Sequence, residues 1–344
     1  MVVIIIPSLQ SGGTEWQTVF LVRALAARFA ICIWIYDRQH IDPDLHRRLQ
    51  EIVGLRIVFG GDFAGLRAVL RERPKIILSY AINYYLPEIA LKLVSGAALI
   101  TERRNLYHWM KTQRRARFQE RIRNRLTTET LCNSESVAER VREFEPEVKN
   151  RIRVIYNAVS PMVRKCIAGK PAIIAVSNVK RGKGLEVVLQ VFKVLRDEKI
   201  GDSVDFAIFG RLDEPGVFEG IDKAFLGEIY RGSAAQEEIY DSAIALLHLS
   251  ESEGFPNAVV EAAAAGVIPI LSDIPVHREI FSDCAIFVRG VDDAATATRE
   301  LIRIWENDRS TFAQRVARCK ALADRFSLSA RVDQYESILL AYRH

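Results

Sequence analysis

The sequence lacks several features that assign a chain to a class at once. Its five cysteines are scattered and odd in number, with no C-x-x-C pair, which argues against a disulfide framework or structural zinc and favours a reducing compartment. No apolar run reaches the roughly 18 residues of a membrane span. No basic segment precedes Val2–Ile6, so we expect no signal peptide. The sequence also lacks a Walker A loop and the glycine pattern of a dinucleotide-binding site.

The composition is that of an ordinary globular protein with two domains. The chain has 344 residues, of which 49% are hydrophobic and 26% charged. The net charge of +5 is unevenly spread. Residues 1–158 hold 25 Lys and Arg against 16 Asp and Glu (+9), and residues 159–344 hold the other 23 against 27 (−4). We therefore expect an anionic partner for the first half.

Short apolar runs alternate with helical patterns along the whole chain. Nearly continuous apolar strands separated by helices predict parallel β-α-β units. Strands are expected in the first half at 2–6, 31–36, 55–59, 76–79, 98–101, 131–133 and 153–156. Strands are expected in the second half at 173–176, 205–209, 223–226, 245–249, 268–271 and 285–288.

The fold class predicted from this pattern is α/β, with two Rossmann-like doubly wound domains. We place the first domain at 1–158 and the second at 159–326, joined by a linker around 157–171, with a carboxyl-terminal helix at 327–344. Ligands of such domains bind at the carboxyl ends of the strands. Asp42–Pro43–Asp44 has a metal-like spacing but is better explained as a helix start, and no metal site is predicted.

The strongest motif is Ser250 to Ala262, which follows a strand and opens a helix. Glu253 and Glu261 are eight residues apart, and Asn257 is a suitable cap for the helix that begins between them and contains Glu261. Free amides near the helix start suit phosphate or hydroxyl oxygens. One turn inside the helix, the Glu261 carboxylate can accept from the two adjacent hydroxyls of a ribose. A single glutamate at a helix start is more often merely solvated, so it is the whole string that carries the interpretation.

This string resembles the E-x7-E signature of the retaining glycosyltransferases of family 4, which have the GT-B architecture. The segments at 153–159, 241–249 and 269–279 also resemble that family, so the resemblance spans most of the chain. It implies that Glu261 binds the nucleotide ribose and that Glu253 faces the hydroxyls of the donor sugar. It also implies that the segment Gly254–Phe255–Pro256–Asn257 holds the sugar and phosphate through its backbone N–H groups, which all of these residues except Pro256 possess.

The loop 175–184 follows another strand and ends in Gly182–Lys183–Gly184. The resemblance implies that Lys183 is the cation that stabilises the leaving nucleotide diphosphate. The family often has an arginine five residues earlier, where this chain has Asn178, a further donor-binding candidate. Lys180 or Arg181 can substitute for that arginine, although neither stands at the matching position.

Two loops of the first half complete the predicted site. Gly12 and Gly13 follow the first strand, and the resemblance implies that this loop lies near the donor phosphates and the acceptor. Thr101–Asn105 carries a Glu-Arg pair that resembles a subset of the family. Arg103 is therefore predicted to act in catalysis and Arg104 to meet an anionic acceptor.

A basic patch extends from Arg103 to Arg125, where nine basic residues are opposed only by Glu120 within that span. One interpretation is an ordinary helix, solvated on one side and packed on the other. The sharper one is attachment to an anionic membrane surface. The residues predicted for the acceptor or membrane face are Arg104, Trp109, Lys111, Arg114 and Arg115.

The sequence therefore predicts a retaining, metal-independent glycosyltransferase. We expect a nucleotide-sugar donor, with UDP favoured, and a glycan or polyprenyl-diphosphate-linked acceptor used in cell-surface polysaccharide or glycoconjugate synthesis. We expect no cofactor and no nucleic-acid partner, and a location on the cytoplasmic face of the cell membrane. The alternatives are an epimerase or phosphorylase of the same architecture, and a non-catalytic protein that binds a nucleotide sugar or a membrane surface.

Overall fold

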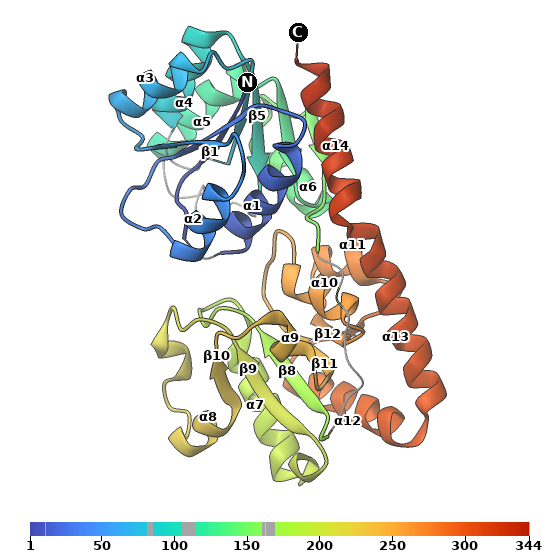
Figure 1. The fold of residues 1–344 in the computed structure, drawn as a ribbon. Coiled ribbons are helices and arrows are strands. Elements are labelled where there is room, and N and C mark those ends of the chain that lie inside the picture. Colours follow the sequence, from blue (N-terminus) through green and yellow to red (C-terminus); the bar gives the residue numbers. More distant parts are fainter. Residues whose placement is uncertain (11, 81–84, 105–113, 160–161, 163–168, 344) are drawn as a thin grey trace. The chain divides into compact units, whose positions relative to one another are not determined.

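The computed structural model divides the chain into two compact units, each an α/β fold (Figure 1). It describes residues 1–10, 12–80, 85–104, 114–159, 162 and 169–343, without the side chains of residues 85, 114–116 and 201. The first unit is Met1–Ala158 together with Leu328–His344, and the second is Val159–Ser327. These bounds lie within one residue of the predicted ones. Among the described residues, no helix is long and apolar enough to cross a membrane.

The described part of the first unit is built on a seven-stranded parallel sheet with the order β3-β2-β1-β4-β5-β6-β7. Its strands are β1 (Val2–Ile6), β2 (Ile31–Ile35), β3 (Arg56–Phe59), β4 (Ile76–Ser79), β5 (Ala98–Arg103), β6 (Glu129–Cys132) and β7 (Ile152–Val154). Its helices are α1 (Gly13–Leu25), α2 (Pro43–Gln50), α3 (Phe63–Arg71), α4 (Tyr85–Ser95), α5 (Arg114–Leu126), α6 (Glu135–Phe144) and α14 (Leu328–Ala341).

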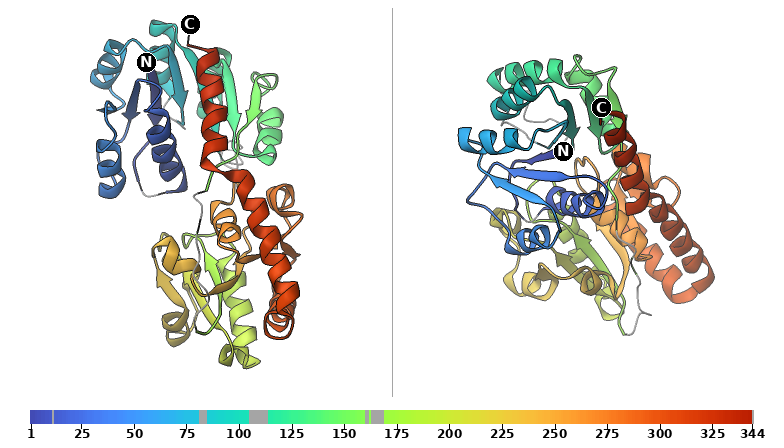
Figure 2. Two further views of the ribbon diagram at one scale, coloured as in Figure 1. Left: turned by 45° about the vertical axis from the view of Figure 1, so that its right-hand side comes forward. Right: turned by 45° about the horizontal axis from the view of Figure 1, so that its top comes forward.

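Alternating strand residues bury both faces of this sheet. Val2, Ile4 and Ile6 of β1 pack with apolar residues of α1, α2 and α14. The intervening Val3 and Ile5 pack with residues of α3 and α4 on the other face. Because both faces are covered, the strands can be apolar at every position, which explains the continuous runs in the sequence. Figures 1 and 2 show α14, in red, lying along this unit.

Acidic and hydroxyl side chains fix where several of these helices begin. Asp42 accepts hydrogen bonds from the amides of Asp44 and Leu45 at the start of α2. Ser134 accepts from the amide of Val137 at the start of α6. Each side chain satisfies amides that have no partner inside the helix. Asp42 and Asp44 thus belong to a helix start, as the sequence indicated.

The described part of the second unit is built on a six-stranded parallel sheet with the order β10-β9-β8-β11-β12-β13. Its strands are β8 (Ala172–Val176), β9 (Asp205–Phe209), β10 (Tyr230–Gly232), β11 (Ala243–His248), β12 (Ile268–Ser272) and β13 (Ile286–Val288). Its helices are α7 (Leu185–Asp197), α8 (Lys223–Ile229), α9 (Gln236–Tyr240), α10 (Asn257–Ala264), α11 (Pro275–Phe281), α12 (Val291–Asn307) and α13 (Arg309–Ala323), with single 3-10 turns η2 (Ile200–Asp202), η3 (Pro215–Phe218) and η4 (Asp324–Phe326).

One predicted strand is wrong. Residues 223–226 form the first half of α8, and the edge strand β10 follows it. The Asp222 side chain accepts a hydrogen bond from the Phe225 amide, which starts a helix. Phe225 and Ile229, four residues apart, then bury one helical face. The short apolar run alone did not distinguish this amphipathic turn from a strand.

Candidate functional site

Lys183 and Glu253 meet at the carboxyl edge of the second sheet. Lys183 lies in the loop after β8, and Glu253 lies in the loop after β11, the neighbouring strand. The Lys183 Nζ atom is 2.7 Å from Glu253 Oε1, and both side chains are largely buried. The sequence analysis assigned these two residues to one site. They are 70 positions apart along the chain, and the structure brings their side chains into contact.

His248 and Ser250 complete the arrangement around Glu253. His248 Nε2 lies 3.0 Å from Glu253 Oε1, and the Ser250 hydroxyl donates to the same oxygen over 2.8 Å. A carboxylate only accepts hydrogen bonds, so the His248 proton is carried on Nε2. Three donors therefore converge on Oε1, whereas no described residue donates to Oε2.

The electrostatics of this cluster keep Glu253 ionised. Burial alone would raise the pKa of Glu253, but hydrogen bonds and charges from His248 and Lys183 outweigh it and hold the pKa well below its usual range. The ring of His277 packs edge-on against that of His248, 5.5 Å between centroids. Burial lowers the pKa of His277 to about 4, so this second ring stays neutral near pH 7.

Close backbone approach holds the Lys183 loop against the Glu253 loop. A Cβ atom on Gly184 would lie 2.0 Å from the Leu249 carbonyl oxygen, and Gly184 has a φ of +67°. Only glycine adopts this position without strain. The amide of Glu251 donates to the carbonyl of Gly182 over 3.0 Å. The Gly-Lys-Gly sequence thus serves the approach of two loops and presents Lys183 between them.

The start of α10 differs from the expected cap. Asn257 is the first helical residue, and Pro256 occupies the cap position without a side-chain hydrogen bond. The Asn257 amide donates to the carbonyl of Phe255, and those of Val259 and Val260 donate to the carbonyl of Pro256. Part of the amide set predicted for a ligand is thus used within the turn. The half-buried Gly254 precedes the buried Phe255.

Glu261 lies in α10 beside Tyr240, the last residue of α9. The Tyr240 hydroxyl is 3.1 Å from the Ala258 carbonyl oxygen and 3.4 Å from Glu261 Oε2. Burial raises the pKa of Glu261 to about 7, although hydrogen bonds from Gln236 and Tyr240 oppose this. Glu253 and Glu261 therefore have opposite electrostatic settings: Glu253 is held charged, whereas Glu261 has no charged partner among the residues that the structure describes.

Asn178 stands where the family often has arginine. Its side chain shares a hydrogen-bond partner, Asp213, with Arg211 from the loop after β9. The Asn178 side-chain amide donates to Asp213 Oδ2 over 3.2 Å, and Arg211 Nε donates to Asp213 Oδ1 over 2.5 Å. Lys180 and Arg181, the substitutes considered from the sequence, are exposed. Arg211 could not be found from the sequence because it follows β9, remote from the loop that contains Asn178.

The first unit contains the remaining predicted donor residues. Gly12 is the N-cap of α1 with extended backbone, and Gly13 is the first residue of the helix. The predicted donor-binding set is therefore distributed over both units, with Gly12 and Gly13 in the first and the others in the second.

Arg103 occupies a different setting from the catalytic one predicted. Its guanidinium is buried and lies 2.5 Å from Glu120 and 2.8 Å from Glu145, with a further hydrogen bond to Asn124. Arg123 is equally buried and pairs with Glu88 at 2.8 Å and with Glu120 at 3.0 Å. The Arg103 donors are used inside the protein, so this placement gives its catalytic prediction no support. Arg103 instead ties β5 to α5 and to the end of α6.

The basic patch is only in part a surface. The Arg104 side chain is only 9% exposed and pairs with Glu102, so this placement gives it no support as part of a membrane face. Trp109 and Lys111 lie outside the described residues, and Arg114 and Arg115 are described as backbone of α5 only. The exposed basic residues that the structure describes here are Arg117, Arg121 and Arg125.

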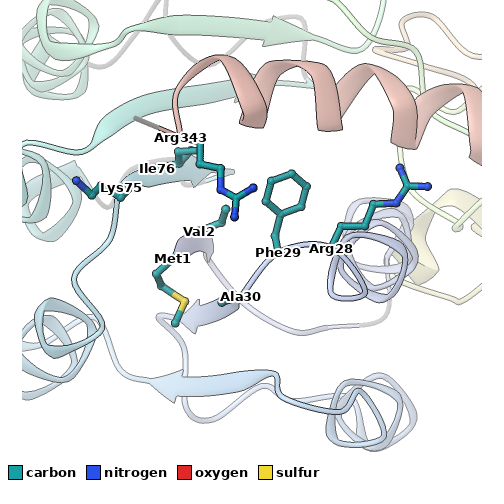
Figure 3. A pocket seen from close by; sticks show the side chains of 8 residues that line it. All are labelled: Met1, Val2, Arg28, Phe29, Ala30, Lys75, Ile76 and Arg343. Atoms are coloured by element: carbon teal, nitrogen blue, oxygen red, sulfur yellow. The ribbon is translucent and has the colours of Figure 1, made fainter.

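A separate pocket of about 200 Å³ opens at the amino ends of β1, β2 and β4 (Figure 3). Its lining includes the basic residues Arg28, Lys75 and Arg343. This is the edge opposite to the one where open α/β sheets bind their ligands, so we assign it no role. Across the described ranges, no three His, Cys, Asp or Glu side chains are grouped to hold a metal ion.

The two parallel-sheet α/β units have the GT-B fold and match solved glycosyltransferase structures. Residues 165–320, nearly the whole second unit, match the family described as glycosyl transferases group 1. No curated protein matches the chain in sequence.

Solved structures support the same fold over the full length. Anabaena HepE, solved in complex with UDP and glucose, is 13% identical with a TM-score of 0.80, and 99% of each chain is covered. A glycosyltransferase from Rickettsia africae is 14% identical with a TM-score of 0.79, covering 99% of this chain and 98% of that one. WaaG, a glycosyltransferase involved in lipopolysaccharide biosynthesis, is 13% identical with a TM-score of 0.74, covering 98% and 99%.

Proposed function

We propose that this protein is a glycosyltransferase that moves a sugar from a UDP-sugar to an acceptor with retention of configuration. The observation that carries the proposal is the Lys183–Glu253 pair at the carboxyl edge of the second sheet, with Glu261 eight residues further along. The match of residues 165–320 to glycosyl transferases group 1 and the UDP bound by Anabaena HepE support it.

Lys183 has the chemistry needed at a leaving diphosphate. Negative charge accumulates there as the bond to the sugar breaks, and a positioned ammonium group stabilises it. In the described structure this ammonium group rests on Glu253 Oε1. We propose that the diphosphate takes over part of this contact, and that Oε2, to which no described residue donates, accepts from hydroxyls of the donor sugar. No cofactor besides the donor enters this scheme.

Glu261 is the proposed ribose ligand. A carboxylate offers two acceptors in one plane, which fits the two adjacent hydroxyls of a ribose. Its raised pKa supports this role, because a buried carboxyl group without a cationic partner gains when a ligand donates hydrogen bonds to it. We propose Tyr240 as a positioning residue, since its hydroxyl holds α9 against this turn of α10.

We further propose that the acceptor is a glycan or polyprenyl-diphosphate-linked sugar, met at the cytoplasmic face of a cell membrane. The support is a surface on α4 and α5, two helices that pack together. Leu86, Leu93 and Val94 on α4 and Phe118 on α5 are each about two-thirds exposed. The exposed Arg117, Arg121 and Arg125 also lie on α5. Apolar side chains beside basic ones are the chemistry of an anionic membrane surface.

The direct test is incubation with a panel of UDP- and GDP-sugars and a polyprenyl-diphosphate-linked acceptor, with the anomeric configuration of the product read by NMR. Transfer with retention is expected, and Glu261→Ala should abolish it through lost donor affinity. Glu237→Ala changes an exposed glutamate of α9 and is the matched control. Inversion of configuration would refute the retaining mechanism. Tight donor binding without turnover would instead favour the non-catalytic alternative.

The membrane proposal has its own test. Sedimentation with vesicles of phosphatidylglycerol should retain the wild type more strongly than vesicles of phosphatidylcholine. A double Phe118→Ser, Ile122→Ser variant should lose this retention, whereas Leu340→Ser, an exposed leucine of α14, should keep it. Equal retention of all three proteins would disprove a docking role for α5.

A further inference from the structure

A second group of buried polar side chains lies at the carboxyl edge of the first sheet. Tyr80 follows β4, Glu102 and Arg104 stand at the end of β5, and Arg331 and Tyr335 come from α14. Arg331 is 3% exposed and Tyr80 is 4% exposed. Arg104 stacks on the Tyr80 ring at 4.5 Å, and Arg331 on the Tyr335 ring at 5.3 Å.

The group contains more donors than acceptors. Arg331 uses its Nη1 atom on the side chain and carbonyl of Gln17, while its Nε and Nη2 atoms have no hydrogen-bond partner in the described part of the chain. Nη1 of Arg104 and the hydroxyl of Tyr80 are likewise buried without a partner among the described residues. Every one of these unpartnered atoms carries a hydrogen to donate.

The charge is also unbalanced. Glu102 is the carboxylate of this group, and its two oxygens are already engaged, Oε1 by the Tyr335 hydroxyl and Oε2 by Arg104 at 2.8 Å. Arg331 forms no ion pair with any described residue, so no described carboxylate contacts its buried positive charge. Burying an unpaired guanidinium is unfavourable unless a counter-ion accompanies it.

We propose that Arg331, Arg104 and Tyr80 form a binding site for a phosphate group. Two guanidinium groups and a phenol that arise from different elements offer donors from several directions. A tetrahedral phosphate, with three or more acceptor oxygens, satisfies such a set better than a planar carboxylate. Assigning this phosphate to the acceptor substrate rests on the proposed function, whereas the phosphate site itself does not.

The test measures phosphate binding to the full chain. Binding is monitored as a rise in the thermal unfolding temperature at constant ionic strength. All variants carry Lys183→Ala, which removes the cation proposed to bind the donor diphosphate in the second unit. Inorganic phosphate should raise the unfolding temperature, and Arg331→Gln should weaken phosphate affinity at least tenfold. Tyr80→Phe should weaken it several-fold. The control Arg47→Gln removes an exposed arginine of α2 and should bind as the parent does.

Equal phosphate affinity in the parent, Arg331→Gln and Tyr80→Phe would overturn the site. Should Arg331→Gln fail to fold, Tyr80→Phe alone decides, because it removes a hydroxyl group that makes no hydrogen bond to any described residue. A short prenyl phosphate titrated in competition then separates the sources. Displacement of inorganic phosphate identifies a lipid-linked ligand, and lack of displacement assigns the site to free phosphate. Since neither measurement uses a donor sugar, failed sugar transfer would count against the proposed function only.

Discussion

The proposed role of Glu261 as the ribose ligand predicts that donor affinity depends on pH near neutrality. Its pKa in the ligand-free protein is raised to about 7, whereas that of an exposed glutamate is near 4.5. If only the carboxylate accepts the ribose hydroxyls, the binding-competent fraction rises from about 10% at pH 6 to about 90% at pH 8. Apparent affinity should therefore increase roughly tenfold between these values, or about 1.4 kcal/mol.

The assay is calorimetric titration with an intact UDP-sugar at pH 6, 7 and 8. An intact sugar diphosphate is chosen because free UDP has a phosphate group that titrates in the same range. Glu261→Gln should bind weakly at all three values and lose the pH dependence. His277 does not interfere, since its pKa is about 4. A flat affinity profile in the wild type, or an unchanged slope in Glu261→Gln, would refute the reasoning.

The same raised pKa predicts an opposite effect on folding. Between pH 4.5 and 7 the folded protein holds a proton on Glu261 that the unfolded chain has lost, so this group destabilises the fold progressively as the pH rises through that window. At pH 8 without nucleotide, Glu261→Gln should therefore be more stable than the wild type by about 1–3 kcal/mol in urea unfolding. A less stable variant at pH 8 would show that the carboxylate is not buried uncompensated.

Three further predictions concern single positions. Lys183→Ala should lower kcat for transfer about 100-fold or more while the fold persists, as measured by initial rates and circular dichroism; a change in donor KM alone would contradict its role at the leaving group. Glu88→Gln should cost about 3 kcal/mol in denaturant unfolding, because it leaves Arg123 buried beside a neutral amide; a loss below about 1 kcal/mol would argue against that ion pair. Gly184→Ala should cost at least about 1 kcal/mol and reduce transfer, because its Cβ would meet the Leu249 carbonyl; wild-type stability and rate would disprove the close approach.

Most strands, and the candidate residues Lys183, Glu253 and Glu261 of the second unit, could be named from the sequence. The strands are apolar at successive positions because both sheet faces are covered, and such runs are visible without a structure. Glu253 and Glu261 were found because their spacing includes a turn and a helix start, both local features. Lys183 was named through the family resemblance of its glycine-flanked loop, which follows a strand.

The partners of these residues were not predictable. His248 ends a buried strand, where a histidine resembles any other core residue until its ring is seen against Glu253. The buried ion pairs of Arg103 were not foreseen because a count of nearby charges found one acidic residue, whereas Glu145, a main partner, follows 42 residues later. Long-range ion pairs leave no periodic trace, so a charged run gives no indication of which members are buried.

The first unit is interrupted in sequence by the second. Met1–Ala158 is completed only by Leu328–His344, and contacts such as Tyr335 with Glu102 and Arg331 with Gln17 join its two pieces. During synthesis, the second unit can fold as a continuous segment while the first still lacks a helix over one face of its sheet. Leu328–His344 leaves the ribosome only after the whole second unit, so the unit that was begun first is completed after the second one. A nonsense mutation that removes α14 would therefore damage the first unit.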